Sequence, residues 1–208
     1  MGDAVKSIWG AVALACLGSL GAAQDIPRIT MQTLDVVSSF AAPPWTTTGD
    51  LLTQAEVFQD QGQTANGTQK MIFETIRKGE SFDDWGMLYA ISAESGLDGD
   101  LIDYVGGQIQ GFTDACDTAR PQAVPRTPVG VMVFVIYCTQ YNNRPGVGEV
   151  AFFNMQMKNG TLVKNYLHIR VPAFELDPMA GMELSSQQLR GGVQAVSALQ
   201  LFDVPASD

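Results

Sequence analysis

The segment DACDTARPQAVPRTPVGVMVFVIYC, residues 114–138, has a cysteine near each end and a long apolar run in its C-terminal half. From Val129 to Cys138 both alternating sets of positions are apolar. A strand that is apolar on both faces is typical of the centre of a sheet, where both faces are covered. The segment therefore predicts a central strand, preceded by a proline-containing stretch without a period of its own.

The residues before this strand predict a helix, DLIDYVGGQIQGFTDAC, from Asp100 to Cys116. Asp98 or Asp100 would cap its N-terminus. Gly106 and Gly107 each cost about 1 kcal/mol relative to alanine inside a helix, which indicates close packing against a sheet or an early break. At about 100° per residue, one apolar stripe contains Leu101, Val105, Ile109, Phe112 and Cys116.

Both cysteines are thus expected to point into the core, Cys116 from the helix and Cys138 from the strand. In an exported protein two inward cysteines usually pair, because the compartment is oxidising. Closing a loop of roughly 20 residues stabilises a fold by about 3 kcal/mol in the chain-entropy model. A reactive thiol would need a nearby cation, and a zinc site would need further ligands, whereas Cys116 is flanked by Asp114 and Asp117. We therefore predict a structural disulfide.

After the central strand, residues 148–171 are typical of a β-hairpin with Asn159-Gly160 at its turn. A two-residue turn predicts the cross-strand pairs Met157–Leu162, Phe153–Tyr166, Ala151–His168 and Glu149–Arg170. A final helix is expected from about 186 to 201, where Ser185 and Gln188 have the spacing of a capping box.

Three strands are expected before the first helix, at 51–58, 70–78 and 85–92. Residues 24–48 have no sustained period and predict an irregular N-terminal segment with one short strand around 30–37. The order βββαβββα indicates an α+β fold in which one antiparallel sheet is sandwiched by helices, as a single domain over residues 49–208.

The N-terminal residues 1–23 are typical of a bacterial signal peptide, with one early lysine, an apolar run from Ile8 to Leu20 and small residues before Gln24. The run is shorter than the roughly 20 residues of a membrane span, and no later segment qualifies. We expect cleavage before Gln24 and a periplasmic or secreted protein. The alternative is a lipid anchor at Cys16, but Ala13 occupies the position where a lipoprotein signal has leucine.

The charge of the chain excludes some partners. With 22 acidic and 12 basic residues the formal net charge is −10, and it stays −10 without residues 1–23, which hold one acid and one lysine. Proteins that bind nucleic acid or anionic membranes present basic clusters, and this sequence has none. We expect neither a nucleic-acid nor a membrane partner.

Few residues carry a chemical signal. His168 is the only histidine, so a Ser-His-Asp system would have to use it, and its register position suggests the rim of a sheet with no evident nucleophile. The sequence has no GxSxG, P-loop or dinucleotide-binding motif. Asp98, Asp100 and Asp103 lack the glycine and distal glutamate of a calcium loop and fit a helix start instead. No catalytic, cofactor-binding or metal-binding residue is assigned.

Two further groups are of interest. Met155 and Met157 share one face of a strand, and Met179 and Met182 follow in a loop. Thioethers suit Cu(I), although methionine is also common core filler. Trp45, which follows two prolines, is a candidate partner-binding residue, with the alternative that it covers the edge of a core.

The stretch GESFDDWGMLYAIS, residues 79–92, precedes the helix, the two cysteines and the Asn-Gly hairpin. This arrangement resembles small exported bacterial proteins of unassigned function, and over Leu51 to Phe202 its element order is similar to the PsbP/Mog1-like α/β/α sandwich. The resemblance implies a role in binding or assembly more than in catalysis. It transfers no functional residue.

The first functional hypothesis is a non-enzymatic exported protein that binds an envelope partner, with Trp45 and the N-terminal segment as the candidate surface. The second is a carrier of a small ligand or of Cu(I), which would need a pocket or a cluster of thioethers. The third is a hydrolase that uses His168.

Overall fold

The structure is a computed structural model that describes residues 27–47, 50–64, 67–177 and 181–205. The predicted signal peptide, the alternative lipid anchor at Cys16 and Met179 lie outside these residues.

The main element is a seven-stranded antiparallel sheet in the order β3-β4-β5-β9-β8-β7-β6. In chain order its strands are β3 (Ala55–Gln63), β4 (Gln69–Arg77), β5 (Met87–Ser95), β6 (Ala119–Ala123), β7 (Val131–Cys138), β8 (Val147–Lys158) and β9 (Thr161–Pro172). A second, three-stranded antiparallel sheet has the order β1-β2-β10, formed by β1 (Arg28–Thr33), β2 (Val36–Ala41) and β10 (Gln200–Asp203). The helices are α1 (Leu51–Gln54), α2 (Leu101–Ala115) and α3 (Ser186–Ser197).

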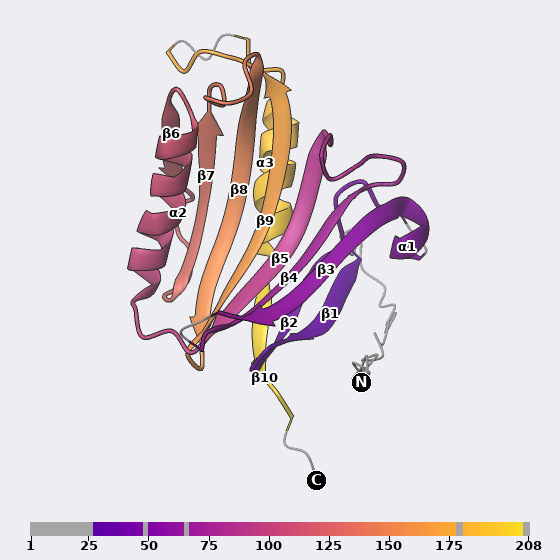
Figure 1. The fold of residues 1–208 in the computed structure, drawn as a ribbon, viewed down its shortest axis with the longest axis vertical. Coiled ribbons are helices and arrows are strands. Elements are labelled where there is room, and N and C mark those ends of the chain that lie inside the picture. Colours follow the sequence, from indigo (N-terminus) through magenta and orange to yellow (C-terminus); the bar gives the residue numbers. More distant parts are fainter. Residues whose placement is uncertain (1–26, 48–49, 65–66, 178–180, 206–208) are drawn as a thin grey trace, which may run out of the picture.

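The large sheet separates two cores. On one face α2 packs over β6, β7 and β8, whereas α3 and the second sheet pack on the opposite face. Figure 1 shows α2 at the β6–β7 end of the large sheet and β3 and β4 at the other end, with α3 behind the strands. Consequently α2 covers only one half of its face, and the face of β3, β4 and β5 extends beyond it.

The prediction of one antiparallel sheet sandwiched by helices in the order βββαβββα is wrong. Strands dominate the described residues and form two antiparallel sheets, which share one core with α3. The missing strands are short and lie near the chain ends, where six or fewer residues give a weak periodic signal. Residues 200 and 201, expected in the last helix, belong to β10.

The N-terminal segment expected to be irregular also differs. Strands β1 and β2 form a hairpin in which Thr33 pairs with Val36. Its turn contains Leu34 with a φ of 58°. Such a positive φ is unusual for a leucine, which explains why the residue types did not suggest a turn.

Two other segments form a different secondary structure from the predicted one. Residues 51–54 form α1 instead of the start of a strand, because Asp50 caps them through a 3.0 Å bond from the Leu52 amide. The proline-containing stretch before the central strand forms β6 at the sheet edge. Pro121 is tolerated there because an edge strand leaves alternate backbone positions unpaired.

The hairpin of β8 and β9 is confirmed, including its register. Met157 pairs with Leu162 and Glu149 pairs with Arg170. Asn159 and Gly160 have φ values of 53° and 71°, as a two-residue turn of type I′ requires.

The disulfide between Cys116 and Cys138 is confirmed, with a Cα–Cα distance of 5.6 Å. Both cysteines are buried, at the C-terminal end of α2 and the end of β7. The bond therefore ties α2 to the sheet. The capping box of Ser185 and Gln188 at the start of α3 is also confirmed.

Candidate functional site

A cleft lies where the sheet face extends beyond α2. It consists of two adjoining hollows of about 410 and 260 Å³, which share Ser92, Glu94 and Lys164. Strands β3 and β4 line the larger hollow, and the N-terminal half of α2 lines the smaller one. We call these two hollows together the α2 cleft.

The strand register explains why these side chains meet. Ser92 of β5 pairs with Lys164 of β9, which pairs in turn with Met155 of β8. Paired residues point to the same face of a sheet. Lys164 therefore stands in the row between a serine and a methionine, at the boundary between the apolar core under α2 and the open half of the sheet.

Lys164 is the central polar group of the cleft. Its Nζ donates a hydrogen bond of 2.9 Å to Gln108 Oε1 on α2, and it lies 5.2 Å from the centre of the Tyr166 ring. Burial lowers the pKa of Lys164, an effect that the nearby carboxylate of Glu94 partly opposes. Among the described residues no carboxylate is within ion-pair distance of this ammonium group.

The neighbouring acids already have partners. Glu94 forms an ion pair of 3.1 Å with Lys70 at the solvent-exposed rim. Glu74 accepts a hydrogen bond of 3.0 Å from the Tyr166 hydroxyl, and burial raises the pKa of that tyrosine. Tyr166 therefore stays neutral, and Lys164 is left as the charged donor at the floor.

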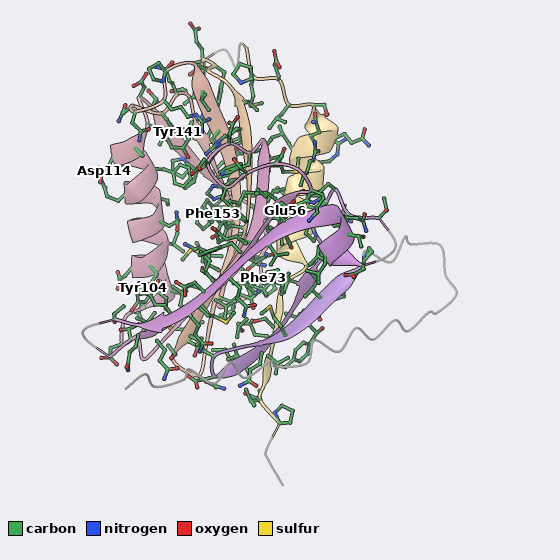
Figure 2. All side chains as sticks on the ribbon, turned by 45° about the vertical axis from the view of Figure 1, so that its right-hand side comes forward. Glu56, Phe73, Tyr104, Asp114, Tyr141 and Phe153 are labelled. Carbon is green, nitrogen blue, oxygen red and sulfur yellow. A yellow bond between two sulfur atoms is a disulfide. The ribbon has the colours of Figure 1, made fainter. Side chains whose placement is uncertain are left out.

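The α2 wall of the cleft contains a glycine. Gly107 lines the smaller hollow, and a Cβ at this position would meet no atom within 4 Å. Figure 2 shows Tyr104, which lines the same hollow, on the first turns of α2. The suggestion that Gly106 and Gly107 allow close packing or break the helix is wrong, because α2 continues to Ala115 and both glycines face open space. Gly107 instead leaves the wall of the cleft open.

His168 lies in a different place, under α2, where its side chain is 17% exposed. Its Nδ1 is 2.9 Å from Glu149 Oε1, and the Glu149 side chain is 1% exposed. Four aromatic rings surround the imidazole at centroid distances of 5.1 to 6.4 Å, those of Trp85, Phe112, Phe153 and Tyr166. The expectation of a rim histidine is wrong, since Nε2 is buried and has no hydrogen-bond partner among the described residues.

The Glu149–His168 pair belongs to a buried polar cluster. Tyr141 hydrogen-bonds the Glu149 carboxylate, and burial raises the pKa of Tyr141. Arg170 stacks on the Trp85 ring at 3.7 Å and donates to the Trp85 carbonyl. No serine, threonine or thiol of the described chain hydrogen-bonds His168, so this cluster has the features of a structural network.

Trp45 packs against the core that contains α3, and it is only partly exposed. Its Nε1 is buried with no partner in the described part of the chain. This placement matches a ring that covers the edge of a core.

The described members of the predicted methionine group divide between the two cores. Met155 is buried in the core under α2, with Met157 packed against that core, whereas Met182 packs against the opposite core. Within the described ranges there is also no group of three or more His, Cys, Asp or Glu side chains suited to a metal. Asp100 is the N-cap residue of α2, although its side chain makes no capping hydrogen bond, and Asp103 lies in the first turn.

The cleft itself was missed at the sequence level, although a signal was present. The predicted register already placed Lys164 opposite Met155, within a hairpin whose two faces are otherwise mostly apolar. A lysine at such a position is rarely fully buried without a partner. Lys164 therefore indicated that no helix covers this part of the sheet completely.

No helix in the described ranges combines the length and apolar character needed to cross a membrane. Comparison of the chain with protein-family models, with curated proteins and with solved structures finds no match.

Proposed function

We propose that this protein is a carrier that binds a small organic molecule in the α2 cleft. The observation that carries the proposal is a preformed cavity of small-molecule size with one desolvated ammonium group, that of Lys164, at its floor. Ligand sites are commonly concave, partly apolar and furnished with a few convergent polar groups. The α2 cleft has these features.

The cleft is bounded by rigid elements. Its floor is formed by paired strands β4, β5 and β9, and its wall by α2, which the disulfide from Cys116 to Cys138 ties to the sheet. A preformed site loses little entropy on binding. The disulfide also supports a place of action outside the cytoplasm, since such bonds persist in oxidising compartments. We infer a bacterial periplasmic or secreted carrier.

The other hypotheses receive less support. A hydrolase would need an accessible base, but His168 Nε2 is enclosed by rings. A copper carrier would need converging thioethers, but Met155 and Met182 belong to opposite cores. Partner binding through Trp45 would need a free ring, and this ring packs against a core.

The experiment is a ligand screen by ¹H–¹⁵N NMR, using small aromatic and aliphatic molecules that are anionic, neutral or cationic. We expect binders to shift the amides of Ser92, Gly107 and Lys164. Gly107→Phe should abolish these shifts by filling the smaller hollow. Gly106→Phe is the matched control, because Gly106 is on the same helix, faces open space and does not line the cleft. The proposal fails if no molecule shifts these amides, or if both variants bind alike.

A further inference from the structure

Three residues that line the α2 cleft can donate hydrogen bonds, namely Lys164, Gln108 and Ser92. Lys164 uses one of its N–H groups on Gln108 Oε1, which leaves two for a ligand. The Gln108 amide also carries an NH₂ group beside that bond. Ser92, the cross-strand partner of Lys164, adds a hydroxyl that lines both hollows. All of these groups can donate a hydrogen bond, so together they suit a ligand group that accepts several hydrogen bonds.

The charge at this point favours an anionic acceptor. A partly desolvated ammonium group is stabilised by a counter-charge, and among the described residues no carboxylate lies within 4.0 Å of Lys164 Nζ. Glu94 is held by Lys70 and Glu74 by Tyr166. A ligand carboxylate would supply the missing charge with charge-assisted hydrogen bonds, which are stronger than neutral ones.

The rim of the cleft limits the ligand to a single negative charge. Asp60 lines the larger hollow and Asp103 the smaller one, and the whole chain carries a net charge of −10. A second negative charge on the ligand would face these acids. Phosphate esters and dicarboxylates are therefore disfavoured.

The remaining walls are suited to an apolar body. Met155 and Leu162, both nearly buried, lie at the bottom of the smaller hollow, and Ile72 and the nearly buried Tyr166 line the larger one. These surfaces extend from Lys164 in both directions. A molecule with one carboxylate and a compact apolar or aromatic group would cover them.

We infer that the ligand of the α2 cleft is a monocarboxylate with an apolar or aromatic body, its carboxylate held by Lys164, Gln108 and Ser92. This inference rests on the proposed carrier function and adds the class of ligand. In this proposal Lys164 recognises the charge of the ligand, and the two hollows recognise its shape.

The test uses phenylacetate, its neutral analogue phenylacetamide and its cationic analogue phenethylamine, titrated into the full chain by calorimetry. We expect phenylacetate to bind at least 10-fold more tightly than either analogue. Lys164→Met should weaken phenylacetate at least 10-fold and leave phenylacetamide unchanged. Lys78→Met is the matched control, since Lys78 is paired with Glu56 and lines neither hollow, and we expect less than a 3-fold effect.

The outcomes separate the two proposals. If phenylacetamide or phenethylamine binds as tightly as phenylacetate, or if Lys164→Met leaves phenylacetate unchanged while Gly107→Phe abolishes binding, the carboxylate inference is wrong and the carrier function stands. If none of the three probes binds and the NMR screen finds no other molecule in the cleft, both are wrong. Equal losses in Lys78→Met and Lys164→Met would show a diffuse effect of charge and would also overturn the inference.

Discussion

Lys164 of β9 and Gln108 of α2 meet across the α2 cleft, with 2.9 Å between Nζ and Oε1. This contact links the sheet to the middle of α2, whereas the disulfide links them at the C-terminal end of the helix. The buried side chains of Val105 and Phe112 also pack against the sheet.

Lys164→Met should stabilise the free protein at pH 7 by about 1 kcal/mol, because replacing a buried charge by an apolar side chain is often stabilising. The measurement is the free energy of unfolding by urea for wild type and variant. A loss of stability larger than 1 kcal/mol would show that the bond to Gln108 outweighs the desolvation of the ammonium group.

The difference in free energy of unfolding between wild type and Lys164→Met should depend on pH. Burial lowers the pKa of Lys164 in the folded protein below its ordinary value of 10.5, so between these two values the unfolded chain binds more protons than the folded one. The stability that Lys164 contributes therefore rises with pH across this window. The extra free energy of unfolding of Lys164→Met over wild type should therefore decrease as the pH approaches 10.5. Glu74, Glu94, Lys70 and Tyr166 surround the lysine in both proteins, so their titration largely cancels in the difference.

Gly107→Ala should raise the free energy of unfolding by about 1 kcal/mol, since alanine is the better helix former and its Cβ would meet nothing. Gly192→Ala in α3 is the opposite case, because a Cβ there would lie 2.6 Å from the Phe152 ring. We expect that variant to lose about 1 to 3 kcal/mol through overpacking. Thermal unfolding of both variants gives the comparison, and equal effects would contradict it.

Removal of the disulfide by Cys116→Ala with Cys138→Ala should cost about 3 kcal/mol, because the bond closes a loop of roughly 20 residues in the unfolded chain. Chemical unfolding of wild type with and without reductant provides an independent measure. An unchanged unfolding midpoint in both experiments would contradict the role of the bond as the main tie between α2 and the sheet.

Glu149→Gln should destabilise the protein by about 3 kcal/mol, because it leaves His168 and Tyr141 without their buried carboxylate partner. His168→Phe tests the same cluster from the other side. A double-mutant cycle should give a coupling energy of about 1 kcal/mol or more. Additive effects would show that the two side chains do not act as a pair.

Several parts of the fold could be predicted from the sequence because each has a strong local cause. The Asn159-Gly160 turn set the register of β8 and β9, and the helix stripe placed Cys116 against Cys138. The second sheet could not be predicted, because its strands are short and its pairing joins β2 to β10 across most of the chain. Contacts of that kind leave no local pattern.

The candidate site shows the same division. The position of Lys164 in its strand followed from the register. Which part of the sheet α2 covers depends on where the helix packs, and the sequence does not give that position. The Glu149–His168 contact is diagonal between neighbouring rows of the hairpin. The predicted register already makes Glu149 and His168 diagonal neighbours, a relationship that directly opposed pairs alone do not reveal.

The most direct test of the account is a crystal structure of the full chain with phenylacetate. The account predicts the ligand in the α2 cleft, with its carboxylate within hydrogen-bond distance of Lys164 Nζ and its ring on the apolar wall near Met155 and Leu162. A saturated crystal with the ligand bound elsewhere and this cleft filled only by solvent would contradict it.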